Sequence, residues 1–117
     1  PRTLAEDGDP LDVLVLCNEI IYPMILVRCY PIGVIKMVDS GSLDEKIIAI
    51  PFGDPTYNGY YDIHELPAHV FDEMMHFFEV YKSLEHKQTT VKEICHRDEA
   101  VEIINKCISM YKDKFGK

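Results

Sequence analysis

The chain has 117 residues, the length of a single domain, and 47% of them are hydrophobic, which is enough for a packed core. Its formal net charge of −8 argues against a nucleic-acid-binding surface, because a phosphate backbone needs a basic stripe. No apolar run reaches the roughly 18 residues that span a bilayer, and no signal peptide is visible. We therefore predict a cytoplasmic protein that binds neither nucleic acid nor a membrane.

Three strands are predicted in the first half of the chain. Residues 12–17 and 46–52 are short aliphatic runs, and 25–38 is a longer one that contains Pro31 and Gly33. Proline cannot donate to a central ladder and glycine favours a bulge, so we expect the middle strand to coil or to break in two. Between the last two runs, the Ser, Gly and Asp content of residues 39–45 predicts a turn.

Two helices are predicted in the second half. Residues 66–85 place apolar side chains at steps of three and four, and Pro67 suits the first turn of a helix. Residues 98–115 form the second helix, with Asp98 as a possible cap and lysines near its C-terminus. We therefore predict a single domain over residues 1–117 whose fold is mainly β with α.

The four cysteines and five histidines suggest no metal site. No C-x-x-C pair is present, so we predict four reduced thiols in an intracellular protein, although their even number also allows disulfides. The histidines lack zinc-type spacing such as H-E-x-x-H and are predicted to lie at the surface or the edge of the core; they are residues 64, 69, 76, 86 and 96.

Carboxylates are crowded in the stretch EDGDPLDVLVL, residues 6–16. Bare carboxylates 4–5 Å apart repel by roughly 3–4 kcal/mol per pair at an effective dielectric near 20, so nearby positive charge is expected. Taken on its own, such a motif is more often a plain Asp/Gly turn. A calcium loop of the EF-hand kind is excluded, because the positions that need Gly and Glu hold Asp12 and Asn18.

A second acidic pair favours a metal site. Asp39 and Asp44 lie at either end of the predicted turn, and Lys46 follows two residues later. Adjacent strands would carry this turn close to Asp7, Asp9 and Asp12, and several converging carboxylates are what a hard divalent cation requires.

These stretches resemble the soluble, Mg-dependent inorganic pyrophosphatases of family I. EDGDPLDVLVL is similar to that family's D-x-D-P-x-D signature. RCYPIGVIKMVDSGSLDEKIIAIP (28–51) resembles its central segment, and HFFEVYKSLE (76–85) resembles its F-F-x-x-Y-K helix. The three segments occur in the family's order and span most of the chain.

The resemblance implies a fold, a reaction and a set of site residues. The fold is a five-stranded, OB-like β-barrel flanked by two helices, and the reaction is the Mg²⁺-dependent hydrolysis of pyrophosphate to two phosphates. The implied Mg²⁺ ligands are Asp7, Asp12, Asp39 and Asp44, with Asp12 bridging two ions. Asp9 would accept the proton of the attacking water. The implied contacts to phosphate oxygens are Lys46, Tyr81 and Lys82.

Two further expectations follow from the family pattern. Members carry additional strands before the acidic signature, so we expect this chain to lack N-terminal barrel strands and to hydrolyse pyrophosphate poorly by itself. Members are also homo-oligomers, dimers or hexamers, so a homo-oligomer is expected. The alternatives are a non-catalytic Ca²⁺-binding module and an OB-type binding module.

Overall fold

The computed structural model describes residues 2–39, 41–84 and 89–116. Within these ranges a few side chains are not described, namely those of Asp39, Tyr81, Lys82, Thr89, Thr90 and Lys92. The description therefore covers the backbone of every predicted site residue and the side chains of Asp7, Asp9, Asp12, Asp44 and Lys46.

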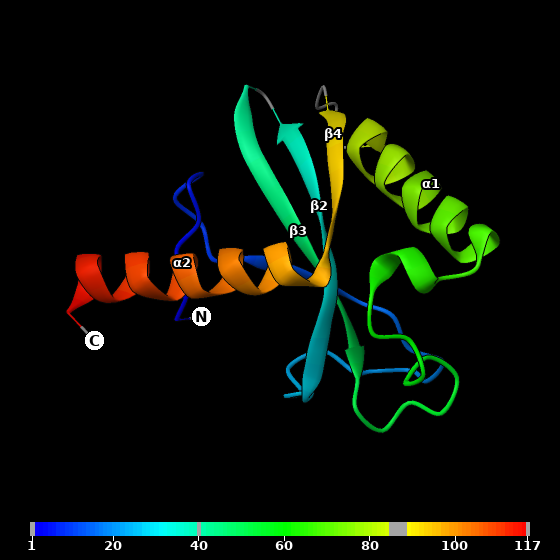
Figure 1. Cartoon of the computed structure of the whole chain (residues 1–117). Helices are drawn as coiled ribbons and strands as arrows, with labels where there is room; N and C mark the ends of the chain where they lie inside the picture. The colour runs from blue at the N-terminus through cyan, green and yellow to red at the C-terminus, as the bar shows by residue number, and fades with distance from the viewer. Residues whose placement is uncertain (1, 40, 85–88, 117) are drawn as a thin grey trace.

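A mixed four-stranded sheet forms the centre of the molecule, in the order β1-β3-β2-β4 (Figure 1). Its strands are β1 (Asp12–Val15), β2 (Cys29–Asp39), β3 (Ser42–Pro51) and β4 (Thr89–His96). β1 pairs with β3 in parallel, and β2 pairs with β3 and β4 in antiparallel fashion. The sheet is open, with β1 and β4 at its two edges, and it is compatible with an OB-like fold that lacks N-terminal strands.

The strand prediction is right for three strands and misses the fourth. The predicted turn at 39–45 is too long, because β2 and β3 continue until Asp39 pairs with Ser42. The predicted interruption of the middle strand takes the form of a register shift between Pro31 and Gly33. β4 escapes prediction because a second shift, at the Lys36/Met37 step of β2, disturbs the two-residue alternation of its side chains.

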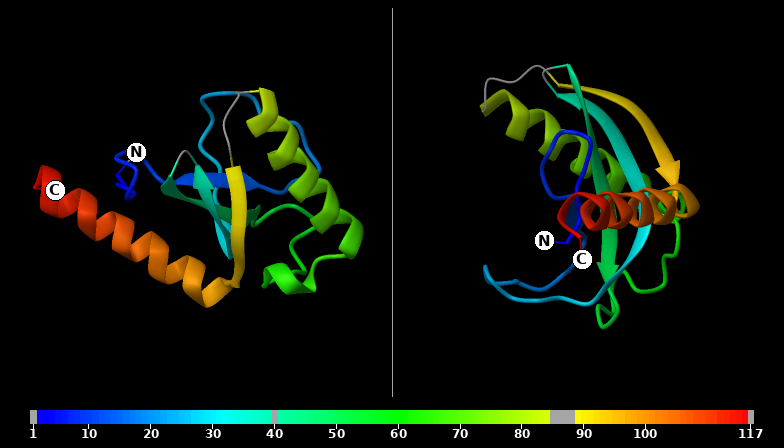
Figure 2. Two further views of the ribbon diagram at one scale, coloured as in Figure 1. Left: turned by 90° about the horizontal axis from the view of Figure 1, so that it is seen from above. Right: turned by 90° about the vertical axis from the view of Figure 1, so that its left-hand side faces the viewer.

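Two helices cover the two faces of the sheet (Figure 2). α1 (Ala68–Leu84) packs Met74 and Phe78 against one face, together with buried residues that include Ile35 and Ile48. α2 (Arg97–Phe115) packs Ile103 and other side chains against the opposite face. Both helices agree with the predicted ranges within two residues.

A short 3-10 helix, η1 (Ile63–Glu65), is pressed against the sheet at Gly33. A methyl group on Gly33 would lie 2.7 Å from the Ile63 Cβ and 2.8 Å from the Cys95 carbonyl oxygen. Ile63 is itself fully buried. Only glycine therefore allows η1 to approach β2 and β4 this closely.

The loop after β3 is fixed by Asp54, one of two buried acidic residues in the described part of the chain. Its carboxylate accepts hydrogen bonds from the backbone N–H groups of Asn18 (2.7 Å), Thr56 (2.9 Å) and Tyr57 (3.1 Å). The Asn18 hydrogen bond is the main cause that lowers the pKa of Asp54, and it outweighs the raising effect of burial. Asp54 thus ties the segment after β1 to the loop after β3.

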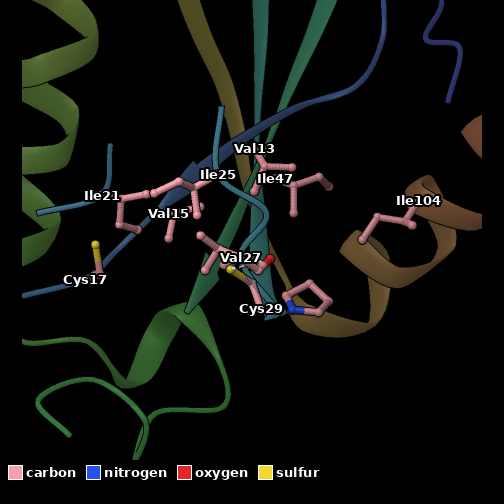
Figure 3. Close-up of a pocket in the computed structure, with 11 residues that line it drawn as sticks. Val13, Val15, Cys17, Ile21, Ile25, Val27, Cys29, Ile47 and Ile104 are labelled. Atoms are coloured by element: carbon pink, nitrogen blue, oxygen red, sulfur yellow. Dashed lines mark hydrogen bonds between the residues drawn. The ribbon is translucent and has the colours of Figure 1, made fainter. Parts of the chain in front are cut away.

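An apolar pocket of about 640 Å³ lies on the α2 side of β1 (Figure 3). Its lining includes Val13, Val15, Ile21, Ile25, Val27 and Ile47. The segment that borders it exposes large apolar side chains almost completely, with Met24 at 102% and Leu26 at 99% of their reference areas. Grouped, exposed apolar side chains of this kind are typical of surfaces that contact other protein.

None of the helices, as far as the structure describes them, has the length and apolar character needed to cross a membrane. All four cysteines are free thiols, and Cys95 and Cys107 are buried, as the reduced-thiol prediction expects.

Candidate active site

The acidic loop before β1 is a tight turn. Gly8 has a positive φ of +86°, which favours glycine, and its N–H donates to the Ala5 carbonyl at 3.0 Å. The Asp7 Oδ1 accepts the Asp9 N–H at 3.0 Å, and the Ala5 N–H donates to the Asp9 carbonyl at 2.8 Å. The carboxylates of Asp7 and Asp9 are consequently held within one turn, and both residues are exposed to solvent.

The loop is anchored to α2 and to the chain before it. Lys106 of α2 donates to Glu6 at 2.8 Å, and the Leu4 N–H donates to the Cys107 carbonyl at 3.0 Å. The Leu11 N–H donates to the Thr3 hydroxyl oxygen at 3.0 Å, just before β1 begins. The turn with Asp7 and Asp9 therefore has a fixed position relative to the start of β1.

The two acidic stretches meet at Lys46. Asp12 and Lys46 are register partners of the parallel β1–β3 pair, and Asp44 lies two residues before Lys46 on the same side of β3. The Lys46 Nζ lies 2.5 Å from the Asp12 Oδ2 and 3.2 Å from the Asp44 Oδ1. The three side chains lie on the α1 side of the sheet, because they alternate with those that face α2.

Burial differs within this cluster. The side chains of Asp44 and Lys46 are only 9% and 13% exposed, whereas that of Asp12 is 60% exposed. Burial lowers the pKa of the Lys46 ammonium, but the hydrogen bonds to Asp12 and Asp44 outweigh it, so the pKa is raised. The space between the two carboxylates thus favours the positive charge of the Lys46 ammonium, and the Asp12 side chain remains largely open to solvent.

The other predicted site residues are placed only by their backbones. Asp39 ends β2 and pairs with Ser42 across the β2–β3 turn. Tyr81 and Lys82 lie in the last turn of α1. Their side chains lie outside the described part of the structure.

The donor chemistry of the cluster fits a hard divalent cation. Asp7, Asp9, Asp12 and Asp44 offer carboxylate oxygens, the ligands that Mg²⁺ and Ca²⁺ prefer. In the structure, which describes all four side chains, no three of these residues bring ligand oxygens within 4.8 Å of one another. Mg²⁺ retains most of its waters and needs only one or two carboxylates per ion, so the exposed Asp12 beside the buried Asp44 meets that requirement.

A different set of three residues brings potential metal ligands together. Among the described residues it is the one group of three or more His, Cys, Asp or Glu whose ligand atoms all lie within 4.8 Å of one another. It consists of Asp62, His64 and His96. Sequence reasoning missed it, because His96 comes from a distant part of the chain and from β4, the strand that was not predicted.

Known proteins resemble this chain over almost its entire length. Residues 1–112 match the profile of a family described as inorganic pyrophosphatase. A soluble inorganic pyrophosphatase 2 of Chlamydomonas reinhardtii is 45% identical over 98% of this chain and 60% of its own length. A soluble inorganic pyrophosphatase 1 of Arabidopsis thaliana is 44% identical over 95% of this chain and 52% of its own.

Solved structures agree with the sequence matches. An inorganic pyrophosphatase from Thermus thermophilus has a TM-score of 0.88 at 38% identity, over 96% of this chain and 66% of its own. One from Helicobacter pylori has a TM-score of 0.88 at 39% identity, over 96% of this chain and 68% of its own. The chain spans roughly half to two thirds of the length of these proteins. The profile match, the related sequences and the fold together show that the chain belongs to the family of soluble inorganic pyrophosphatases.

Proposed function

We propose that this chain carries the catalytic centre of an enzyme that hydrolyses inorganic pyrophosphate to two phosphates and depends on Mg²⁺. The observation that supports it most is the meeting of Asp12 and Asp44 at Lys46. Relatives of the chain bear the name inorganic pyrophosphatase, which supplies the reaction class.

The proposed metal ligands are Asp7, Asp12, Asp39 and Asp44. When bound, the metal would supply electrostatic stabilisation of the phosphate charge and a water of lowered pKa. Asp12 is suited to bridge two ions, because its side chain is 60% exposed and Lys46 donates to its Oδ2. Asp44 would provide the buried, less mobile side of the site.

Asp9 is proposed as the proton acceptor for the attacking water. Asp9 is exposed. Hydrogen bonds to Asp7 and Ala5 fix its backbone, so the point from which its side chain extends is also fixed. A general base has to remain outside the metal's coordination shell to keep its proton affinity. Phosphoryl transfer to water needs positioning and charge neutralisation more than covalent help.

Lys46, Tyr81 and Lys82 are proposed to contact phosphate oxygens. Lys46 keeps its positive charge over the whole physiological pH range, since its pKa is raised. In the metal-free protein its ammonium is paired with Asp12 and Asp44, and it would be released to contact an anionic substrate when these carboxylates bind metal ions. Tyr81 and Lys82, in the last turn of α1, would add a hydrogen-bond donor and a second positive charge.

We further propose that efficient catalysis needs chain beyond these 117 residues, of the kind that the longer relatives possess. The apolar pocket beside β1 and the exposed side chains of Ile20, Met24 and Leu26 support this view. A strand packed there would hold β1, and with it Asp12, in place. We also propose a cytoplasmic homo-oligomer, which the free thiols and the exposed Val80 and Leu84 of α1 support.

The test is phosphate release from pyrophosphate. It compares this chain with an extended protein, in which the N-terminal region of the Chlamydomonas relative precedes Pro1. The extended protein should release phosphate with Mg²⁺ and stop when EDTA removes the metal. The 117 residues alone should be at least about 100-fold slower, because small misplacements of catalytic groups cost that much. No release by the extended protein would contradict the proposed reaction, and equal rates would contradict the need for further chain.

A further inference from the structure

Asp62, His64 and His96 form a compact cluster on the surface, apart from the acidic loop and from Lys46. Asp62 caps η1, His64 lies within η1, and His96 ends β4 just before α2. The cluster therefore joins two parts of the chain that are more than thirty residues apart.

Both imidazoles approach one carboxylate oxygen. The Asp62 Oδ1 lies 3.2 Å from the His64 Nδ1 and 3.0 Å from the His96 Nδ1. The rings are stacked with their centroids 4.0 Å apart. In the metal-free protein each Nδ1 can share a proton with this oxygen, which also accepts the backbone N–H of His64 at 3.0 Å.

The same spacing suits a metal ion. In a tetrahedral zinc site with metal–ligand bonds of about 2.0–2.1 Å, neighbouring ligand atoms lie about 3.3 Å apart. The two oxygen–nitrogen separations of 3.0 and 3.2 Å are close to that edge length, and all three ligand atoms lie within 4.8 Å. Two imidazoles and one carboxylate are typical zinc ligands, whereas Mg²⁺ and Ca²⁺ prefer oxygen alone.

The surroundings hold the three ligands in place. The second Asp62 oxygen accepts the Arg97 N–H at 3.2 Å, and the Asp62 N–H donates to the Glu65 carboxylate at 2.9 Å. The close contact between Ile63 and Gly33 fixes η1 against β2 and β4. A ligand set that is already ordered loses little entropy on binding.

The charges nearby act in opposite directions. The positive end of the α2 dipole, at the helix N-terminus, disfavours a cation there. Asp62 and Glu65 supply two negative charges on the same short turn. The His64 and His96 side chains are 48% and 67% exposed, so an ion can reach them from solvent.

We propose that Asp62, His64 and His96 bind one divalent transition-metal ion, with Zn²⁺ the ion that fits best, and that a solvent molecule completes its coordination. The ion would link η1 to the β4–α2 junction. This site is independent of the proposed hydrolysis, because the acidic cluster contains no histidine.

The experiment is an NMR titration of the folded chain with Zn²⁺, with Mg²⁺ in excess, that follows the imidazole resonances of the five histidines. His64 and His96 should shift together and saturate at one ion per chain, and His69 and His76 of α1 should not. His96→Asn should weaken Zn²⁺ binding at least about tenfold, as loss of a ligand does, while asparagine remains a good N-terminal cap for α2. His64→Gln should weaken it likewise.

His69→Ala is the matched control, since His69 is also exposed but lies outside the cluster, and it should bind Zn²⁺ like the parent. Equal shifts of all five histidines, no shift at His64 and His96, or unchanged binding in His96→Asn would each overturn the proposal. The pair would then be hydrogen-bond partners of Asp62 only.

Discussion

Replacing Asp9 by asparagine is expected to lower the rate of pyrophosphate hydrolysis by the extended protein by about 10²–10⁴-fold, the range for loss of a general base. Asparagine keeps the size of the side chain and cannot accept the proton of the attacking water. The Asp7–Asp9 turn should survive, because its hydrogen bonds use the backbone of Asp9 and not its carboxylate. The measurement is kcat for phosphate release, with Mg²⁺ saturating.

The thermal stabilisation that Mg²⁺ gives distinguishes an aspartate that binds the metal from one that acts as the general base. In Asp9→Asn, the rise in unfolding temperature on adding Mg²⁺ should persist. In Asp12→Asn, both that rise and the activity should fall, because Asp12 is the proposed bridging ligand. If Mg²⁺ stabilisation of Asp9→Asn falls in step with its rate, Asp9 is a ligand and its assignment as the base is wrong.

Replacing Asp54 by asparagine is expected to lower the free energy of unfolding by about 2–4 kcal/mol at neutral pH. The carboxylate accepts three backbone N–H groups in a buried site, and an amide can satisfy them only in part. Urea unfolding of the chain measures the loss. Asp72→Asn is the matched control, because Asp72 is exposed on α1, and its effect should stay within about 0.5 kcal/mol.

The Asp54 effect also has a signature in pH. Its pKa in the folded protein is lowered from the usual 3.8, so the carboxylate's contribution is complete above that value. As the pH falls through the lower folded-state pKa the contribution is lost, so the parent and Asp54→Asn should converge in acid. A difference that is constant from pH 6 down to the acid limit would show that the lost stability comes from packing and not from the charge.

Much of the fold could be predicted from local patterns. Apolar steps of three and four gave α1 and α2, and aliphatic runs gave β1, β2 and β3, because each of these elements buries one regular face. β4 could not be found in this way. Its register shift against β2 puts Val91 and Ile94 three residues apart on the α1 side, which breaks the strand period.

The sequence named candidate site residues but could not give their arrangement in space. The spacing of the aspartates and the family resemblance named Asp12, Asp44 and Lys46, whereas the parallel pairing of β1 with β3, which brings them together, is a long-range property of the sheet. The sequence also gave no sign that Asp44 and Lys46 would be buried and Asp12 exposed. The cluster of Asp62, His64 and His96 could not be predicted either, because it depends on long-range pairing that places the end of β4 beside η1.

The central claim is that divalent cations occupy the space between the aspartates of the two acidic stretches, and anomalous diffraction tests it most directly. Crystals of the extended protein grown with Mn²⁺, which takes oxygen ligands as Mg²⁺ does, would be measured near the manganese absorption edge. The account predicts anomalous peaks at bonding distance from the carboxylates of Asp7, Asp12 and Asp44. Carboxylates turned towards solvent, with no peak among them, would contradict it.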